Sequence, residues 1–441
     1  MRWLPWLTTF ATVAVLTRPP RLFAQARATA ASRASDAGVV HSAPAGVSAA
    51  PEQEITIQNL ETRLLPIAIP PMRGDAAAGD VTSIVSRDLQ LSALFRVLDP
   101  ATFSADLAAE ALTIVPSAWL PSGATAVVKA QVTGSGDSVR AEFRVWEPGR
   151  PAAAVLSRTY GPGSTRSVAH QIANELIRQY TGRTGIFGTR LLFARRTGHN
   201  RKDIFMVDCD GANLSQISSG RRLNFLPAWG PDGIYYSMQT REGYLALVRS
   251  ARPQPVPIVQ IEGMVMGASF AGGHLAVVLT SDGNPEIYVG HTDGSNLTRL
   301  TRDSSADISP VLSPDGSRIA FVSDRDGSPQ VYVMPATGGT PRRVSTVGDY
   351  NQTPAWSPDG RTLAYAGRLG GNFDIFTVNA DGTHARRLTE NQGSNSDPTY
   401  SPDGRLIAFS SSRGGIFLMN TDGLAQQQIL AGGGETLRWE R

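Results

Sequence analysis

Trp356-Ser357-Pro358-Asp359-Gly360 is one of several copies of a five-residue pattern, and its recurrence decides the fold. Ser-Pro-Asp-Gly is typical of a tight turn, because Pro presets φ at about −65°, Asp tolerates the next position and Gly adopts the left-handed conformation that closes the turn. The large residue before the turn belongs to a strand and packs against neighbouring units. Complete or degenerate copies occupy residues 229–233, 270–273, 312–316 and 400–404, and a last large residue stands at 439.

A second pattern runs in phase with the first. Strand-like cores occur at residues 204–207, 245–248, 287–289, 331–333, 375–378 and 416–419, and most of them lead into an Asp-Gly or Gly-Gly turn. A period of roughly 42 residues with several short strands is typical of β-propeller blades. Leu191 to Ala194 and the strand ending at Trp439 are each left without a complete blade. We therefore expect a six-bladed propeller over residues 184–441, closed by the C-terminal strand so that no sheet edge is exposed.

The preceding residues, 54–183, predict a small α/β domain. The predicted fold class is thus multidomain: a small N-terminal α/β (α+β) domain followed by a six-bladed all-β propeller closed by the C-terminal strand. The expected elements are a strand from Leu64 to Ile69, a helix that Asp80 caps and that carries Leu94 and Phe95, a strand over 96–98, a hairpin of 125–132 with 138–146, and a helix from Ser164 to a stop at Gly182.

The first residues predict export. Residues 1–26 resemble a signal peptide with a small-x-small cleavage pattern at Ala24-Gln25-Ala26, although an uncleaved anchor is the alternative. Residues 27–53 are a low-complexity linker rich in Ala, Ser, Arg and Pro. No later apolar run reaches membrane-spanning length, so we expect the mature protein in the periplasm.

Composition narrows the function classes. The net charge is only +3 and no dense basic cluster occurs, which argues against nucleic acid binding. Cys209 is the only cysteine, so we expect a buried structural thiol and no intrachain disulfide. The six histidines lack ligand spacing, so we expect no metal and no cofactor. The Asp residues of the repeated turns are explained by turn chemistry, and we expect no enzyme activity.

Together these features resemble the TolB family of the Tol–Pal envelope system. The resemblance covers residues from about 54 to 441. It rests on the propeller repeats and on four stretches of the α/β domain and its exit: Leu65-Pro66-Ile67-Ala68-Ile69-Pro70, the expected helix end Leu94-Phe95-Arg96, Ala169-His170-Gln171-Ile172-Ala173-Asn174 and Thr181-Gly182-Arg183-Thr184-Gly185-Ile186-Phe187.

The resemblance implies a protein that binds other proteins. Members of this family bind the lipoprotein Pal at the mouth of the propeller and contact the inner-membrane protein TolA through their N-terminal region, supporting outer-membrane constriction at cell division and envelope integrity. In this chain the low-complexity segment from Arg27 to Gln53 occupies the place of the TolA-contacting segment. The resemblance further implies a monomer that reaches membranes only through its partners.

The repeat spacing predicts where a partner binds. If the large-residue strand of each blade is innermost, the residue five positions before the large residue rings the mouth of the central channel. These residues are Asn224, Val265, Asp307, Asn351 and Asn395, and Arg221, Arg222, Tyr350 and Gln392 lie near them. The alternative for each Asn or Asp is local hydrogen bonding within a loop.

Two other function classes stay open. Peptidases of the prolyl oligopeptidase type place a similar propeller before a hydrolase domain, but this chain has no Gly-x-Ser-x-Gly motif. A propeller that binds a glycan or another small molecule would have an aromatic mouth, whereas the predicted mouth residues are mostly amides and carboxylates.

Overall fold

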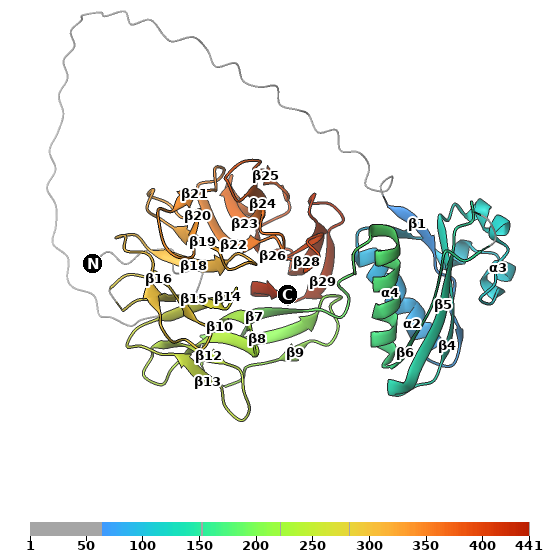
Figure 1. The fold of residues 1–441 in the computed structure, drawn as a ribbon, viewed down its shortest axis with the longest axis horizontal. Helices are drawn as coiled ribbons and strands as arrows, with labels where there is room; N and C mark the ends of the chain where they lie inside the picture. Colours follow the sequence, from blue (N-terminus) through green and yellow to red (C-terminus); the bar gives the residue numbers. More distant parts are fainter. Residues whose placement is uncertain (1–63, 151–152, 221, 282, 441) are drawn as a thin grey trace, which may run out of the picture. The chain divides into compact units, whose positions relative to one another are not determined.

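The computed structural model describes residues 64–150, 153–220, 222–281 and 283–440, which belong to one compact unit of residues 59–441. It contains a small α/β domain and a six-bladed β-propeller, as predicted (Figure 1). The predicted signal peptide (1–26), linker (27–53) and beginning of the α/β domain (54–63) lie outside the described residues. The domain boundaries stay predictions.

The α/β domain is built on one sheet with the strand order β3-β1-β4-β5-β6, in which β2 also pairs with β4. β1 runs parallel to β3 and β4, and the β4–β5–β6 meander is antiparallel. The strands are β1 (Leu65–Ala68), β2 (Arg73–Gly74), β3 (Phe95–Val97), β4 (Ala126–Thr133), β5 (Val139–Trp146) and β6 (Leu156–Gly163). The β4–β5 hairpin therefore confirms the hairpin that the sequence predicts.

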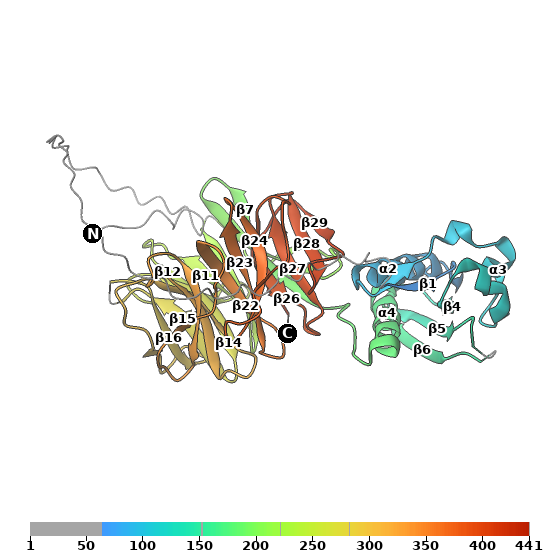
Figure 2. The ribbon, with the colours of Figure 1, turned by 90° about the horizontal axis from the view of Figure 1, so that it is seen from above.

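Two long helices contribute to the core of this sheet. They are α2 (Ala78–Leu91) and α4 (Thr165–Thr181), which contact each other, and they are seen most clearly in Figure 2. Their buried apolar residues, among them Val81, Val85, Ile172 and Leu176, share one core with β1, β4 and β5. A second cluster around the fully buried Trp119 includes Val127 and Trp146. The shorter helices are α3 (Ala105–Ala109), η2 (Pro100–Thr102), η3 (Pro116–Ser122) and η4 (Gly136–Ser138).

The structure confirms the predicted caps of α4 but not that of α2. Ser164 caps α4 by accepting the backbone N–H of Ser167, and Gly182 ends it with φ 71°, which confirms the prediction. The prediction for α2 was wrong: Asp80 lies in the first turn, and Ala77 stands at the N-cap without a side-chain hydrogen bond. Leu94 and Phe95 are not helical, because Ala93 adopts φ 55° after the helix and turns the chain into β3.

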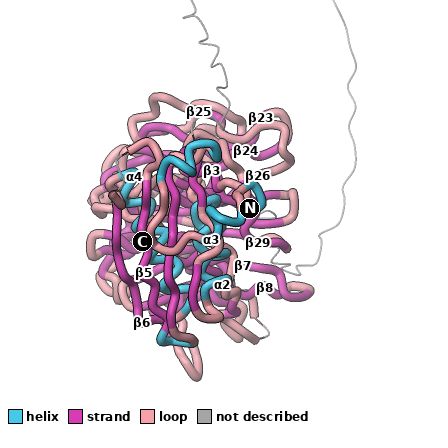
Figure 3. The backbone as a smooth tube through the Cα atoms, turned by 90° about the vertical axis from the view of Figure 1, so that its right-hand side faces the viewer, coloured by secondary structure: helices cyan, strands magenta, loops and turns pink. Residues whose placement is uncertain are grey.

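Each blade of the propeller is a four-stranded antiparallel sheet, and Figure 3 shows how strands dominate the described chain. Blade 1 contains β10 (Asn224–Gly230), β11 (Gly233–Gln239), β12 (Leu245–Arg249) and β13 (Val256–Val259). Blade 2 contains β14 (Val265–Ala271), β15 (His274–Leu279), β16 (Glu286–His291) and β17 (Thr298–Arg299). Blade 3 contains β18 (Asp307–Leu312), β19 (Arg318–Ser323), β20 (Gln330–Pro335) and β21 (Arg342–Arg343).

The remaining blades complete the ring. Blade 4 contains β22 (Tyr350–Trp356), β23 (Thr362–Leu369), β24 (Asn372–Asn379) and β25 (Arg386–Arg387). Blade 5 contains β26 (Asn395–Tyr400), β27 (Leu406–Ser411), β28 (Gly415–Asn420) and β29 (Gln427–Ala431). The closing blade joins β30 (Glu435–Trp439) to β7 (Arg190–Gly198), β8 (Arg201–Asp208) and β9 (Ser215–Gln216). The C-terminal strand thus completes a blade begun by the first propeller strands, as predicted.

The large-residue strands are innermost. Each innermost strand contacts the innermost strand of the next blade, in the order β10, β14, β18, β22, β26 and β30. β30 in turn contacts β10, which closes the ring. Every innermost strand has a register shift against its neighbour at the same place. A residue with φ between 51° and 61° marks each shift: Leu226, Gly267, Ser309, Thr353, Asp397 and Thr436. These are β-bulges, which bend the strand and increase its twist.

The repeated turn has the structure that its composition predicts. In blade 4, the Ser357 hydroxyl donates to Oδ1 of Asp359 at 2.6 Å, and the same oxygen accepts the backbone N–H of Arg361. Gly360 closes the turn with φ 67°. The hydrogen bond from Ser357, together with the backbone donors, holds the pKa of Asp359 below its usual value. The carboxylate is therefore occupied by the turn itself.

Candidate functional site

The antiparallel order of each blade gives the propeller two different faces. We call the turn face the one that carries the Ser-Pro-Asp-Gly turns and the connections between third and fourth strands. The loop face is the opposite one. It carries the connections between second and third strands and the loops that lead from the outermost strand of one blade to the innermost strand of the next.

The predicted mouth residues lie at the loop-face end of the innermost strands, but their side chains are buried. Asn224, Val265, Asp307 and Asn395 each begin an innermost strand, and Asn351 is the second residue of β22. Their exposed fractions are 2% for Asn224 and 0% for the others. These five residues therefore stand where the sequence predicts them along the strands. Their side chains, however, are not exposed to a partner.

The junction between blades 3 and 4 shows what such a residue does. The Asn351 amide donates to Oε1 of Gln330 at 2.7 Å and to the carbonyl oxygen of Val347 at 2.9 Å. Ser345 donates its hydroxyl to the same Gln330 oxygen at 2.7 Å and accepts the backbone N–H of Val331. The three side chains connect the third strand of blade 3, and the segment that follows its fourth strand, to the innermost strand of blade 4. We call this arrangement an inter-blade latch.

Two further junctions repeat the latch with a carboxylate in place of the glutamine. Asp203, Ser218 and Asn224 connect the closing blade to blade 1, with Asn224 donating to Asp203 at 3.1 Å. Asp374, Thr389 and Asn395 connect blade 4 to blade 5. Asp307 begins the innermost strand of blade 3, and it receives two hydrogen bonds of 2.9 Å from Arg325 of the same blade. Burial raises the pKa of Asp307 against the opposing effect of these partners, which include Ser323 and Thr301.

Val265 is the one apolar residue among the five predicted mouth residues, and its surroundings show which way this position faces. At the junction of blades 1 and 2 it packs with apolar residues, among them Leu247 and Leu279. The same position in blades 1, 3, 4 and 5 holds Asn or Asp, and it is buried in every case. A buried Asn or Asp needs hydrogen-bond partners, whereas a buried Val needs apolar neighbours. The position therefore faces the interior of the propeller and not the channel. Hydrogen bonding between neighbouring blades thus accounts for the asparagines of the column, where the sequence left open local hydrogen bonding within a loop.

The neighbouring residues of the predicted site are more accessible. Arg222, Tyr350 and Gln392 are half-buried at the loop face, and Arg221 lies outside the described residues. The Tyr350 ring makes an edge contact with Phe373 at 5.5 Å and lies under the guanidinium of Arg368 at 5.2 Å. Arg368 is in turn held by Asp349 at 3.0 Å. That a partner binds at the mouth stays a prediction, and these half-buried side chains are the better candidates for direct contact.

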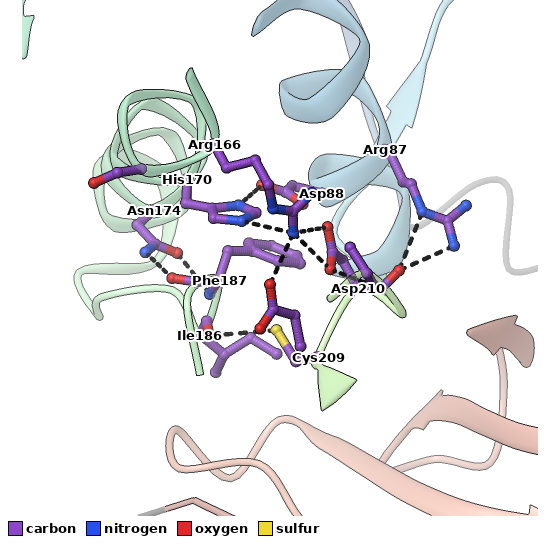
Figure 4. Close-up of polar contacts among 12 residues, drawn as sticks. Arg87, Asp88, Arg166, His170, Asn174, Ile186, Phe187, Cys209 and Asp210 are labelled. Atoms are coloured by element: carbon purple, nitrogen blue, oxygen red, sulfur yellow. Dashed lines mark hydrogen bonds and ion pairs between the residues drawn. The ribbon is translucent and has the colours of Figure 1, made fainter. Parts of the chain in front are cut away.

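A second polar site was not predicted from the sequence. It lies where the α/β domain meets the β8–β9 turn of the closing blade (Figure 4). Arg166 of α4 donates to Asp208 at 3.1 Å and to both carboxylate oxygens of Asp210 at 2.9 and 2.8 Å. Arg87 of α2 donates to the carbonyl oxygen of Asp210 at 3.1 and 3.3 Å. We call this site the joint cluster, together with Asp88 and His170.

Asp88 and His170 form the buried part of the joint cluster. Asp88 is fully buried on α2, and its Oδ2 lies 2.7 Å from Nδ1 of His170. Nε2 of His170 lies 3.2 Å from the Arg166 guanidinium, which can only donate. The Asp88 carboxylate accepts the Nδ1 proton of His170. Burial raises the pKa of Asp88 to about 6, against the opposing effect of His170.

The cluster does not need a metal ion to balance its charge. Donor atoms of Asp88, His170 and Asp210 lie within 4.8 Å of one another, a spacing compatible with a metal site. The Arg166 guanidinium, however, already donates to both oxygens of Asp210 and so supplies the positive charge. The prediction of no metal and no cofactor stays a prediction.

Cys209 lies between the two aspartates of the β8–β9 turn and is buried, as predicted, with an exposed fraction of 1%. Its backbone N–H donates to the carbonyl oxygen of Thr189, and its Sγ lies 3.5 Å from the carbonyl oxygen of Ile186. Burial raises the pKa of the thiol well above its usual value. These properties are those of a structural thiol, not of a nucleophile.

Comparisons with known proteins agree across sequence and structure. The family model of the TolB beta propeller domain matches residues 177–368 and 351–438, and that of the TolB amino-terminal domain matches residues 53–149. The Tol-Pal system protein TolB of Anaeromyxobacter dehalogenans strain 2CP-C is 37% identical over 283 residues, which cover 60% of this chain and 63% of that protein. Its counterpart in strain 2CP-1 is 36% identical over 276 residues, 58% of this chain and 62% of that protein. The chain therefore spans less than two thirds of the length of these relatives.

A solved structure extends the likeness over more of the chain. The crystal structure of TolB from Acinetobacter baumannii is 26% identical, has a TM-score of 0.74 and covers 85% of this chain and 96% of that one. Within the described residues, none of the helices is both long and apolar enough to span a bilayer.

Proposed function

Because this chain belongs to the TolB family, we propose that it is a periplasmic component of the Tol–Pal system that acts by binding other proteins and not by catalysis. Its task in this proposal is to link the outer-membrane lipoprotein Pal with the inner-membrane protein TolA. This link supports outer-membrane invagination during cell division and the integrity of the envelope. The observation that carries the proposal is the match of both the propeller and the N-terminal domain to TolB family models.

The Pal-like partner binds at the loop face. The joint cluster places the β8–β9 turn, a turn-face element, against α2 and α4, which argues for the opposite face as the docking surface. The inter-blade latches support this choice, because they fix the loops around the mouth and so reduce the conformational entropy lost on binding. Direct contacts come from half-buried side chains such as Arg222, Tyr350 and Gln392.

The TolA-like partner binds through the N-terminal region, which includes residues 27–53. That region follows the predicted signal peptide and lies outside the described residues. The proposal for TolA therefore rests on the family alone.

Calorimetry with the purified mature chain and Pal from the same organism tests the proposal. We expect saturable one-to-one binding, and a well-folded chain that shows no binding would contradict the function. Arg222→Ala combined with Gln392→Ala should weaken binding at least about tenfold. Arg361→Ala, an exposed arginine in the turn of blade 4 on the opposite face, is the matched control. Unchanged affinity of the double variant would refute the loop-face site but not the function.

A further inference from the structure

Charged residues on the loop face fall into two sectors, and the first sector surrounds the closing blade. It comprises the β7–β8 connection with the adjoining strand ends, the loop before β10 and the β27–β28 connection of blade 5. Among the described residues its carboxylates are Asp203 and Glu435, which are bound to Arg201 and Lys202. Its other cations are Arg195, Arg196, Arg222 and Arg413. The first sector therefore has an excess of positive charge.

The four arginines of this excess have no ion pair with a carboxylate among the described residues. Arg196 is exposed and Arg222 is half-buried. The guanidinium of Arg413 lies 4.2 Å from the centre of the Phe417 ring, and that of Arg195 donates to two backbone carbonyl oxygens. These neutral partners hold the cations in place without cancelling their charge. The charge therefore acts on a molecule that approaches the loop face.

The second sector lies across the channel, around blade 3. In the ring of innermost strands β18 stands three places from β30, so blade 3 is opposite the closing blade. Asp303 and Asp324, in the loop before β18 and in the β19–β20 connection, have no ion pair in the described part of the chain, and each accepts a backbone N–H. The cations of these two segments are Arg302, which is exposed, and Arg325, which is bound to Asp307.

Blade 4 adds to the second sector. Arg387 is shared between Asp374 and Glu390, so one negative charge of this group is left over. Asp349, in the loop before β22, is paired with Arg368 and adds no net charge. The second sector thus has an excess of negative charge, which is smaller than the positive excess of the first sector.

The loop face as a whole suits a protein partner. Tyr244 of blade 1 and Leu369 of blade 4 are large apolar side chains at this face, with exposed fractions of 39% and 42%. Burying them against another apolar surface is favourable. A nucleic acid or an anionic membrane presents charge of one sign, so the second sector would repel it. A folded protein can present charges of both signs together with apolar side chains.

We infer that the Pal-like partner docks with a matching pattern of charge, an acidic surface over the closing blade and a basic surface over blade 3. This inference rests on the proposed function and adds the orientation of the partner about the axis of the channel. Six blades of similar shape offer several ways to seat a partner on the mouth. Rotation by half a turn would bring like charges together at both sectors, so the charges select one orientation.

Stopped-flow association of the purified mature chain with Pal from the same organism tests both sectors. Arg196→Gln combined with Arg413→Gln removes two cations from the first sector. Asp303→Asn combined with Asp324→Asn removes two carboxylates from the second sector and keeps an oxygen that accepts the backbone N–H. Both double variants should associate at least about threefold more slowly at about 10 mM salt, and the differences should disappear at about 1 M salt.

The two double variants distinguish matched surfaces from simple attraction between net charges. They change the net charge of the chain by equal amounts in opposite directions, so attraction between net charges predicts that one variant associates more slowly and the other faster. That result, or unchanged rates in both variants, would overturn the inference. Arg361→Gln and Asp381→Asn, which remove exposed charges from the turn face, are the matched controls and should keep the rate of the unmodified chain.

Two further measurements cover folding and function. Urea denaturation shows whether the double variants fold. If the loss of the Arg413 contact with Phe417 destabilises the chain, Arg196→Gln alone tests the first sector and should slow association by about twofold. Absence of any binding by the unmodified chain would contradict the proposed function itself, whereas binding at rates that ignore both sectors would contradict only the inference.

Discussion

Replacing Asn351 by Ala should destabilise the propeller without touching any surface that a partner can reach. The Asn351 amide nitrogen donates to Gln330 at 2.7 Å, to the Val347 carbonyl oxygen at 2.9 Å and to the Gly348 carbonyl oxygen at 3.3 Å. The side chain is fully buried, so water does not replace these bonds. A buried hydrogen bond contributes about 1 kcal/mol, and the acceptors left behind add to the loss.

Two features of the site limit the size of the effect. Gln330 keeps its hydrogen bond from Ser345, and Oδ1 of Asn351 has no partner among the described residues, so its removal relieves a small cost. We therefore expect the free energy of unfolding to fall by about 2 kcal/mol for Asn351→Ala. Asn351→Asp should be worse by at least about 1 kcal/mol, because it places a carboxylate against three acceptor oxygens.

Urea denaturation followed by tryptophan fluorescence measures both variants. Asn372→Ala, which removes an exposed asparagine of blade 4, is the matched control and should change stability by less than about 0.5 kcal/mol. If Asn351→Ala were as stable as this control, or if Asn351→Asp were more stable than Asn351→Ala, the latch would be refuted. A loss of stability in Asn351→Ala would also affect how binding experiments are designed. Alanine substitutions at the predicted mouth residues would then impair folding, so a loss of Pal binding in such variants would not locate the binding site.

Three further predictions concern stability. Gly211→Ala should lower the free energy of unfolding, measured by urea denaturation, by roughly 3 kcal/mol or more, because the new Cβ would lie 1.9 Å from the Ile429 carbonyl oxygen at a residue with φ 89°. The control Gly414→Ala has φ 101° with open space around it and should lower the same free energy by only about 1 kcal/mol. Equal losses would contradict the tight packing of the β8–β9 turn. Trp356→Phe should cost about 1–2 kcal/mol, because the buried indole N–H donates to the Val311 carbonyl oxygen at 2.9 Å, and a neutral substitution would show that this bond contributes nothing. The pKa of Asp88 is about 6 in the native state against 3.8 for an ordinary aspartate, so between these pH values the native state holds a proton that the unfolded chain has lost. The free energy of unfolding should therefore fall by about 3 kcal/mol as the pH rises from 4 to 7, and Asp88→Asn should lack this pH dependence. Identical pH profiles of the two chains in urea denaturation would contradict the raised pKa.

The turn chemistry predicted the propeller well, because Pro, Asp and Gly fix local backbone angles that repeat in every blade. Ring closure followed from counting strands at both ends of the repeat. The bulges of the innermost strands were not predicted: only position 267 holds a glycine, and the other blades hold Leu, Ser, Thr or Asp at a positive φ that the surrounding sheet enforces. Asp80 misled the prediction of α2, because an Asp in the first turn of a helix looks like a cap in sequence.

The candidate site was predicted only in part. The column from Asn224 to Asn395 was placed correctly along the innermost strands, but spacing along a chain does not reveal whether a side chain faces the channel or the neighbouring blade. Val265 was the available signal, since an apolar residue in an otherwise polar column indicates an interior position. The joint cluster was not predicted, because Asp88, Arg166 and Asp210 are distant in sequence and Asp210 was already explained by the Asp-Gly turn that follows a strand core.

The footprint of Pal on the propeller, measured by hydrogen exchange of the complex against the free chain, tests the docking account most directly. We expect slower exchange in the loop-face segments 240–244, 303–306, 346–350 and 391–394, with the Ser-Pro-Asp-Gly turns unchanged. Protection confined to those turns or to the α/β domain would contradict docking at the loop face.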